Sequence, residues 1–249
     1  MITIKKKKIK NKNNLINWFK NWKILNCINS NINLKIKNSK IVLESKLNKK
    51  IENFNIDFKS KKLNYRIKNK KNLYKEKLIQ AIGLKNKKKY IFDLTAGCGT
   101  DSFLLVSSGF KVIMIEKNPI ISYFLSKALK KIYKNKKYGS FYKKNLKFYC
   151  NNSLKLLKKK KINPKIIYLD PMFKTYNHKS LPKKNIYFLR KITKFDIFQT
   201  KKLLIESIKI AKKVIIKRFF KDKKLLNIKP KNIIYSKKKK YRFEIYKKI

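Results

Sequence analysis

Three carboxylates in this sequence each end a short apolar run of the kind that forms a buried strand. They are Asp93, Glu116 and Asp170, and the polar residue Asn152 follows a fourth run. Ligands of open α/β sheets bind at the carboxyl ends of parallel strands. We therefore expect these four side chains to lie along one edge of a sheet and to form one site.

The segment between Asp93 and Ser102 predicts a tight turn that leads into a helix. Gly97 and Gly99 supply the turn, but Ser102 stands where a dinucleotide-binding loop has a third glycine. Asp101 adds negative charge where the helix dipole would otherwise hold a pyrophosphate. Both features favour a cofactor without phosphates. S-adenosylmethionine (SAM), which carries a sulfonium and an ammonium, suits these carboxylates; an ordinary charge at a helix start is the alternative for Asp101.

The positions of the polar residues assign them to parts of SAM. We expect Asp93 or Asp101 to hold the methionine end, directly or through water. Glu116 is placed to accept hydrogen bonds from both ribose hydroxyls. Asn152 and Ser153 are expected to read the adenine edge.

Asp170-Pro171-Met172-Phe173 is the candidate catalytic motif. It resembles the N/D-P-P-Y/F signature of methyltransferases that modify an exocyclic amine of a base. Such an amine is a poor nucleophile because its lone pair is delocalised into the ring. The Asp170 carboxylate and the Pro171 carbonyl are expected to accept its two N–H groups, and Phe173 to stack on the base, which contributes about 1–3 kcal/mol. A simple turn with an aspartate at a strand end is the alternative.

A more specific resemblance rests on five segments, which occur in the order DLTAGCGTD, IEKNP, YLDPMF, VIIKR and YRFEIY. Together they resemble the RsmJ family, bacterial methyltransferases that modify guanine N2 in small-subunit (16S) ribosomal RNA. The resemblance is good over Leu84–Tyr246 and weak over Leu34–Leu84. It implies a Rossmann-like class I methyltransferase fold and SAM contacts at Thr100-Asp101, Glu116-Lys117, Asn152-Ser153 and Asp170.

Two positions depart from the family pattern. The family usually has arginine where this chain has Thr100. It also has a glycine-rich basic segment where this chain has Tyr65–Glu76, which contains no glycine. The second departure concerns the part expected to engage RNA.

Basic residues after the motif are expected to contact RNA phosphates. The predicted RNA-binding residues are Lys174, Lys179, Lys183, Lys184, Lys217 and Arg218. A solvated basic loop is the alternative for the first four, and a structural ion pair for the last two. His178, the only histidine, is expected to be an exposed loop residue, because this transfer needs no base that titrates near neutrality.

The charge of the chain points to a polyanionic partner. The formal net charge is +58, from 70 Lys and Arg against 12 Asp and Glu. Such a field favours nucleic acid first and an anionic membrane second. A drift toward A/T-rich codons is the alternative source of the charge, and we assign most of its magnitude to drift because lysine, asparagine and isoleucine are abundant throughout.

Three cysteines, Cys27, Cys98 and Cys150, have no C-x-x-C spacing. Neither a metal site nor a disulfide framework is expected, and a reducing compartment fits. The sequence also has no apolar signal core and no run long enough to span a bilayer. We expect a cytoplasmic protein with no membrane association and no metal.

Residues 1–85 are predicted to form a small α+β domain or extension, and residues 86–249 the Rossmann-like domain. The first part is expected to contain an amphipathic helix at Leu15–Trp22, a β-hairpin at Leu34–Leu47 and a strand at Asn53–Phe58. Tyr65–Glu76 is expected to be a basic connector, either solvated or in contact with phosphates.

From Tyr90 onward, apolar runs alternate with helical patterns, which predicts a parallel sheet with helices on both faces. The expected strands are Tyr90–Leu94, Lys111–Ile115, Lys147–Cys150, Lys165–Leu169 and Val214–Lys217, closed by an antiparallel hairpin of Ile233–Ser236 and Tyr241–Tyr246. The expected helices cover 101–108, 119–133, 153–157, 187–192 and 201–211.

These observations lead to one main hypothesis and two alternatives. The main hypothesis is SAM-dependent methylation of a guanine N2 amine in small-subunit ribosomal RNA, free or within the small subunit. The second is adenine-N6 methylation of DNA or RNA, because the motif around Asp170 serves either amine. The third is an RNA-binding assembly factor that has lost turnover.

Overall fold

The computed structural model of the chain describes residues 33–37, 40–47, 50–86, 89–171, 184–193, 196–237 and 240–248. It divides into two compact units. The smaller comes from Met1–Ile56 and Lys174–Phe195, and the larger from Asp57–Phe173 and Asp196–Ile249. The division predicted from the sequence, at residue 85, stays a prediction; in the structure, the segment from Asp57 onward groups with the larger unit.

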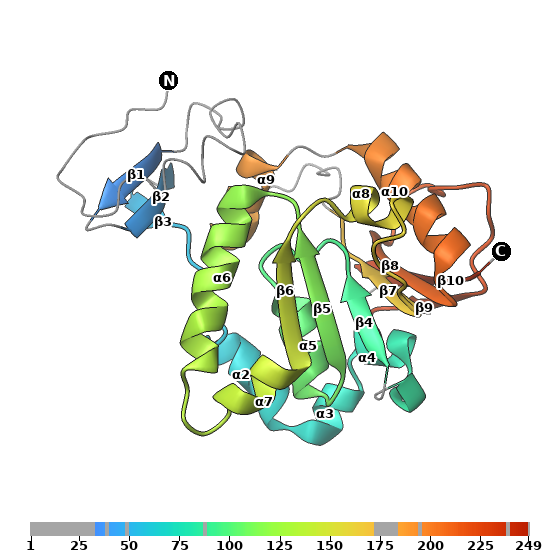
Figure 1. Cartoon of the computed structure of the whole chain (residues 1–249), viewed down its shortest axis with the longest axis horizontal. Helices are drawn as coiled ribbons and strands as arrows, with labels where there is room; N and C mark the ends of the chain where they lie inside the picture. Colours follow the sequence, from blue (N-terminus) through green and yellow to red (C-terminus); the bar gives the residue numbers. More distant parts are fainter. Residues whose placement is uncertain are drawn as a thin grey trace. The chain divides into compact units, whose positions relative to one another are not determined.

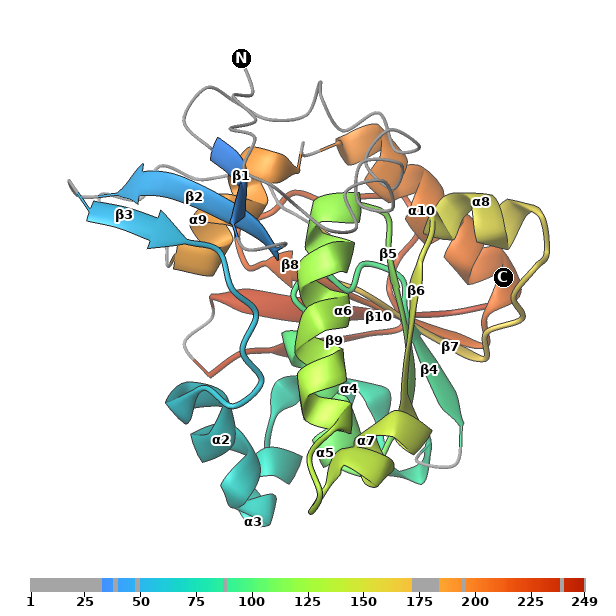
Figure 2. The same cartoon turned by 60° about the vertical axis from the view of Figure 1, so that its left-hand side comes forward.

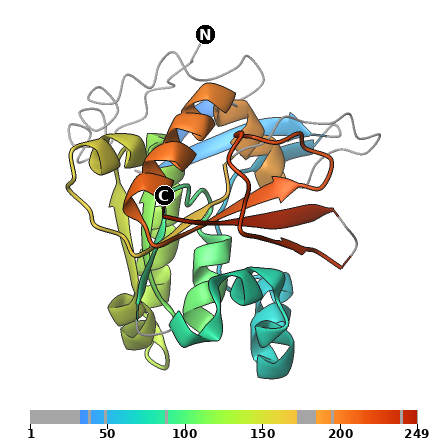
Figure 3. The ribbon, with the colours of Figure 1, turned by 90° about the vertical axis from the view of Figure 1, so that its right-hand side faces the viewer.

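A seven-stranded sheet forms the centre of the larger unit, in the order β6-β5-β4-β7-β8-β10-β9 (Figure 1). Its strands are β4 (Tyr90–Asp93), β5 (Lys111–Glu116), β6 (Leu146–Cys150), β7 (Ile166–Leu169), β8 (Lys213–Phe219), β9 (Asn232–Tyr235) and β10 (Tyr241–Lys247). The first five in spatial order are parallel. β10 runs antiparallel to β8 and β9, and this hairpin ends the sheet (Figure 3). The predicted parallel sheet and closing hairpin are confirmed.

Helices cover both faces of this sheet. Figure 2 shows α5 (Thr100–Ser107) and α6 (Pro119–Tyr133) on one side of β5 and β6, and α8 (Ser153–Lys158) and α10 (Ile197–Ile210) on the other. Connections between parallel strands are right-handed. The helices therefore change face once the chain begins to add strands on the other side of β4. Between β4 and β5 the chain crosses on one face, and after β6 it crosses on the other.

The core follows from the alternation of strand residues. On the face of α8 and α10, Ile115, Ile167 and Val214 pack with helix residues such as Leu157 and Leu204, all essentially buried. β7 is central, and all four of its residues are buried. Strands covered on both faces read as continuous apolar runs, which is why these segments were predictable.

The smaller unit contains a three-stranded antiparallel sheet and one helix. The sheet comprises β1 (Asn33–Lys37), β2 (Lys40–Leu47) and β3 (Lys50–Asn53), and the helix is α9 (Lys184–Ile192). The antiparallel pairing of β1 with β2 confirms the hairpin predicted at Leu34–Leu47. The rings of Phe54 and Phe188 pack with their centroids 5.6 Å apart, which joins the helix to the segment after the sheet.

Two predictions for this part of the chain were wrong. Asn53–Phe58 is not a strand: pairing ends at Asn53, although Phe54, Ile56 and Phe58 are buried and produce the alternation. Tyr65–Glu76 is not a connector but mostly helix, in α2 (Lys61–Lys68) and α3 (Lys70–Tyr74). The predicted helix at Leu15–Trp22 lies outside the described residues.

Short helices were the elements that the sequence did not predict. These are α2, α3, α4 (Lys77–Ile82) and α7 (Gly139–Asn145), with a 3-10 turn at Leu84–Asn86. None of the helices in the described ranges is long and apolar enough to cross a bilayer.

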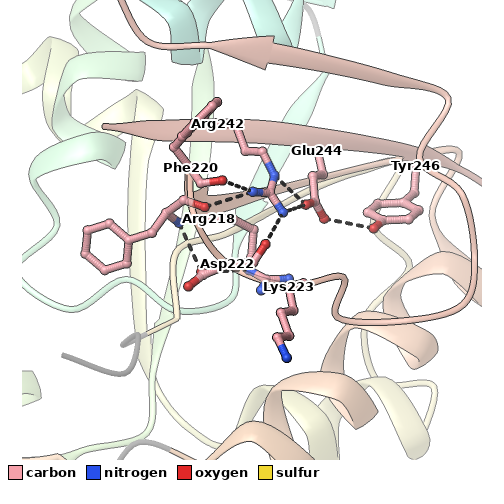
Figure 4. A network of polar contacts seen from close by, with 8 residues as sticks. Arg218, Phe220, Asp222, Lys223, Arg242, Glu244 and Tyr246 are labelled. Atoms are coloured by element: carbon pink, nitrogen blue, oxygen red, sulfur yellow. Dashed lines mark hydrogen bonds and ion pairs between the residues drawn. The ribbon is translucent and has the colours of Figure 1, made fainter. Parts of the chain in front are cut away.

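Two arginines, Arg218 on β8 and Arg242 on β10, hold the loop that follows β8 (Figure 4). The Arg242 guanidinium donates to the carbonyls of Phe219, Phe220 and Asp222 and pairs with Glu244 at 2.7 Å. Arg218 pairs with the Asp222 carboxylate at 3.2 Å. This largely buried network ties the loop to β8 and β10.

Candidate active site

The three predicted carboxylates lie at the carboxyl ends of neighbouring strands. Asp93 and Glu116 are the last residues of β4 and β5, and Asp170 directly follows β7. The three strands are adjacent in the order β5-β4-β7, so the carboxylates share one edge of the sheet. Asp93 and Glu116 are buried, whereas the Asp170 side chain retains 31% exposure. This edge is therefore placed to bind a ligand that carries positive charge or hydrogen-bond donors.

The loop from Leu94 to Gly99 is fixed by contacts with the neighbouring strand ends. The Leu94 N–H donates to the Tyr168 carbonyl at 3.1 Å, and the Ser153 hydroxyl donates to the Leu94 carbonyl at 2.7 Å. The Asp170 N–H donates to the Thr95 hydroxyl at 2.6 Å. The loop and the candidate catalytic motif are thus positioned directly against each other.

Gly97 and Gly99 are needed for different physical reasons. Both adopt positive φ, +53° and +70°, where side chains are strained. A Cβ on Gly99 would also lie 2.9 Å from a methyl carbon of Leu125, so any side chain there would force Leu125 to move. Among the described residues, the nearest atom to a Cβ on Gly97 would be the Thr95 carbonyl oxygen, at 3.9 Å. Space beside Gly97 is therefore open to a ligand.

Asp93 anchors the loop to helix α5. Its carboxylate accepts the Ser102 hydroxyl at 2.6 Å and the Thr95 N–H at 3.2 Å. Burial raises the pKa of Asp93 to about 7, opposed by these hydrogen bonds and increased by the nearby charges of Asp101 and Asp170. A bound cation would stabilise the ionised form of this buried carboxyl group.

Glu116 accepts one backbone N–H on each carboxylate oxygen. Gly97 donates to Oε2 at 2.9 Å and Asn118 to Oε1 at 2.7 Å. Burial raises the pKa of Glu116, and these two donors oppose the rise. Each carboxylate oxygen can accept more than one hydrogen bond. Glu116 is therefore oriented by the glycine loop and retains the capacity to bind two hydroxyls.

Asp101 and Asp170 bind the same ammonium group. The Lys217 Nζ lies 2.8 Å from Oδ2 of Asp170 and 3.2 Å from Oδ2 of Asp101. The Tyr168 hydroxyl donates to Asp101 Oδ2 at 2.7 Å. Asp101 is thus part of an ion-pair cluster, beyond its position at the start of α5.

The pKa values of the two carboxyl groups in this cluster are shifted in opposite directions. Burial tends to raise the pKa of Asp101, but Lys217 and the Tyr168 hydroxyl outweigh it, and the pKa is lowered. For Asp170, burial outweighs the attraction of Lys217, and the neighbouring Asp101 charge adds to it, so the pKa is raised. Asp170 is the member of the pair that is easier to protonate.

Asn152 and Ser153, which were predicted to contact adenine, form hydrogen bonds with backbone groups of the protein. The Asn152 side chain accepts the Lys155 N–H at 3.1 Å and caps α8, while Ser153 binds the loop as described above. Thr100 is exposed at the start of α5, and exposed Lys117 donates to the Gln199 side chain at 3.4 Å. Their contacts with a cofactor stay predictions.

The predicted RNA-binding residues fall into three groups. Lys217 lies in the carboxylate cluster, and Arg218 is 5% exposed and paired with Asp222, which is the structural ion pair left open by the sequence. Lys184 begins α9 and pairs with Glu52 at 2.9 Å, with both side chains partly exposed.

Pro171 is the last described residue of the candidate catalytic motif. Phe173, Lys174, His178, Lys179 and Lys183 lie outside the described residues.

Sequence reasoning missed Thr95, Ser102 and Tyr168. Ser102 was noted only as a missing glycine, yet its hydroxyl is fully buried against Asp93. Tyr168 is fully buried and was assigned to the strand core. A polar group in an otherwise apolar strand directly before a catalytic motif was the available signal, because a buried hydroxyl needs a hydrogen-bond partner.

The donor set matches the chemistry of SAM. Carboxylates at the ends of β4, β5 and β7 suit a sulfonium and an ammonium, Glu116 suits a ribose, and the space beside Gly97 admits a ligand. No group of three or more His, Cys, Asp or Glu in the described part of the chain is arranged to hold a metal ion. The parallel sheet with an antiparallel β10 and this carboxylate edge define a class I SAM-dependent methyltransferase.

Comparison with known proteins specifies the family. The family described as "Putative SAM-dependent methyltransferase" matches residues 17–248. Two relatives called ribosomal RNA small subunit methyltransferase J come from Buchnera aphidicola. The one from subspecies Acyrthosiphon pisum is 39% identical over 173 residues, 69% of each chain, and that from subspecies Schizaphis graminum is 43% identical, over 69% of this chain and 68% of the relative. The chain belongs to the ribosomal RNA small subunit methyltransferase J (RsmJ) family.

A solved structure supports the fold independently. The crystal structure of a SAM-dependent methyltransferase from Neisseria gonorrhoeae superposes with a TM-score of 0.64 at 24% identity. The match covers 87% of this chain and 83% of that one. The predicted fold class and family resemblance are confirmed.

Proposed function

We propose that this protein transfers a methyl group from SAM to the exocyclic N2 amine of a guanine in small-subunit (16S) ribosomal RNA. Membership of the family and the curated relatives' name support the substrate class. The observation that carries the mechanism is the placement of Asp170. Its N–H is fixed by Thr95 and its carboxylate lies at the same edge as Asp93 and Glu116.

Asp170 makes the amine a better nucleophile by accepting one of its N–H groups, while the Pro171 carbonyl accepts the other. This pairing localises the nitrogen lone pair, which otherwise spreads into the ring. When bound, SAM would supply an electrophilic methyl group from its sulfonium, whose sulfur would keep the bonding electron pair and become a neutral thioether. Asp170 or water would accept the proton that the methylated nitrogen loses. Alignment supplies much of the rate.

The remaining site residues are assigned to the cofactor. Asp93 and Asp101 hold the methionine end, and Glu116 holds the ribose hydroxyls. Gly97 and Gly99 shape the loop beside it. The adenine side is assigned to Asn152-Ser153, with Thr100 and Lys117 at the rim.

RNA engagement is assigned to the residues around and after the motif. Phe173 stacks on the target base, which must leave its helix if it is paired. Lys174, Lys179, Lys183 and Lys184 contact phosphates. Arg218 is left out of this set because its guanidinium is buried in an ion pair. A ribosomal RNA substrate places the enzyme in the cytoplasm.

A purified-component assay tests this function. Wild type, Asp170→Ala and the control Asp196→Ala are incubated with methyl-labelled SAM and small-subunit RNA, free or in assembled subunits, and the modified nucleoside is identified. Asp196 caps α10, outside the carboxylate edge. Asp170→Ala removes the hydrogen-bond acceptor and should lower transfer about a hundredfold or more while SAM and RNA binding persist, and the control should retain activity. Equal transfer by the Asp170 variant refutes its role.

A further inference from the structure

Lys217 occupies the centre of the carboxylate cluster. It lies on β8, and the parallel register that pairs Leu169 with Ile216 sets Lys217 beside Asp170. Its Nζ contacts both carboxylates and lies 5.4 Å from the centroid of the Tyr241 ring. Only 23% of the side chain is exposed. This ammonium is therefore committed to groups within the protein.

The cluster is anchored by four separate elements. Asp101 belongs to α5, Tyr168 and the following Asp170 to the β7 segment, Lys217 to β8 and Tyr241 to β10. The Tyr168 hydroxyl fixes the Asp101 oxygen that Lys217 also contacts. Lys217 in turn ties down Oδ2 of Asp170. The orientation of the Asp170 carboxylate thus depends on one cation held from both sides.

Negative charge exceeds positive charge around this cation. The titratable groups that act on the cluster are Asp93, Asp101, Asp170, Lys217, Tyr168 and Tyr241, with Arg66 and its ion-pair partner Glu76 on the side of α2 and α3. Burial opposes the charged form of Lys217, but Asp101 and Asp170 outweigh burial and raise its pKa. Without Lys217, Asp101 and Asp170 would face each other with no cation between them. Neighbouring carboxylates in that situation share a proton.

We propose that Lys217 is a positioning residue for methyl transfer: its ammonium orients the Asp170 carboxylate and keeps it an anionic hydrogen-bond acceptor for the target amine. This inference rests on the proposed function of Asp170. A protonated Asp170 donates a hydrogen bond from its hydroxyl, so part of its accepting capacity for the amine is lost. Lys217 is thereby moved from the RNA-binding set predicted from the sequence to the support of the catalytic carboxylate.

The two roles of Lys217 predict different kinetics. A phosphate contact would affect the KM for RNA and the salt dependence of binding, with kcat unchanged. A positioning residue affects kcat and its pH dependence, with the KM for RNA little changed. Lys217→Met removes the charge and Lys217→Arg retains it. The matched control is Lys213→Met, on the same strand, where Nζ donates to the Ile82 carbonyl at 3.0 Å and no carboxylate is involved.

Steady-state kinetics of these variants between about pH 6 and pH 9 test the proposal. For Lys217→Met we expect kcat to fall about tenfold or more at the acidic end, with recovery as the pH rises, because Asp170 then ionises without help. Lys217→Arg should retain most of kcat, and Lys213→Met should follow the wild type. A pH-independent loss in Lys217→Met, or a change confined to the KM for RNA, overturns the proposal.

A measurement on the free protein separates this inference from the proposed function. Carboxyl ¹³C NMR of aspartate-labelled protein follows the titration of Asp170 without RNA or SAM. Its midpoint should move to higher pH in Lys217→Met and stay near the wild type in Lys217→Arg. An unmoved midpoint refutes the inference even if the enzyme is active, whereas a wild-type enzyme that transfers no methyl group to small-subunit RNA refutes the proposed function alone.

Discussion

Alanine substitution of the two loop glycines should separate folding from cofactor binding. At Gly97, alanine adds backbone strain, because φ is +53°, which costs about 1–2 kcal/mol. Its methyl group meets no atom closer than 3.9 Å in the part of the chain that the structure describes. The methyl instead enters the space assigned to the cofactor. Gly97→Ala should therefore be mildly destabilised and should bind SAM or its demethylated product about tenfold more weakly or worse.

At Gly99 the same substitution should act mainly on folding. The backbone strain is similar, at φ +70°, but the new Cβ also lies 2.9 Å from Leu125, 3.2 Å from Met114 and 3.3 Å from Phe58. Overpacking of this kind costs about 1–3 kcal/mol, so the total loss is about 2–5 kcal/mol with the strain included. A loss of that size is a large part of the 5–15 kcal/mol that stabilises a typical domain.

Urea denaturation and isothermal titration calorimetry measure the two effects on the same preparations. The expected order is wild type, Gly97→Ala and Gly99→Ala in decreasing stability. Among folded variants, Gly97→Ala should show the larger affinity loss per unit of stability lost. If Gly97→Ala is as destabilised as Gly99→Ala, then the space beside Gly97 is not open. If Gly97→Ala binds the cofactor as the wild type does, then that space is not where the cofactor lies.

Three further perturbations test other parts of the structure. Burial raises the pKa of Asp93 to about 7 from an ordinary value of 3.8, so its contribution favours the folded state at low pH and is lost as the pH rises through about 7. Urea denaturation should thus give a free energy of unfolding that falls by about 2–3 kcal/mol more between pH 5 and pH 8 in the wild type than in Asp93→Asn; equal falls would contradict this. Arg242→Met should cost about 3–5 kcal/mol, because Glu244 is left buried without its cation, and a loss below about 1 kcal/mol would show that the network in Figure 4 contributes little. RNA binding, followed by fluorescence anisotropy, should weaken linearly on a log–log plot against salt, with a slope of about −0.7 per phosphate contact for a single strand, and a flat response would exclude a phosphate-dominated interface.

The carboxylate edge of the sheet was predictable because its signals are local. A buried parallel strand reads as an apolar run, and a charged residue directly after it marks the strand end, as at Asp93, Glu116 and Asp170. Helix α6 was predicted with its observed bounds because proline is typical of the first helical turn, where Pro119 lies. Sequence alone therefore located the edge of the sheet where these carboxylates meet.

The partners of these carboxylates were not predictable because they depend on strand register. Lys217 meets Asp170 across 47 positions and Tyr168 meets Asp101 across 67. Only the pairing of β7 with β8 brings the first two side chains together. In a chain with so many lysines, nothing local distinguishes Lys217 from a lysine that contacts RNA.

The helices at Tyr65–Glu76 were hidden by composition. Lysine and asparagine dominate the segment, so the apolar stripe of α2 and α3 reduces to single residues such as Leu63 and Leu73, which are 4% and 1% exposed. A stripe that thin does not produce a clear helical period. The same segment contains Arg66 of α2, which forms an ion pair at 2.7 Å with Glu76, the residue directly before α4.

The most direct test of the proposed function is nucleoside analysis of small-subunit ribosomal RNA from cells with and without this protein. We expect one N2-methylguanosine to disappear when the protein is absent, to return with the wild-type chain, and to stay absent with Asp170→Ala. An unchanged content of N2-methylguanosine in that RNA would contradict the assignment, and a dependent N6-methyladenosine would replace the substrate with adenine.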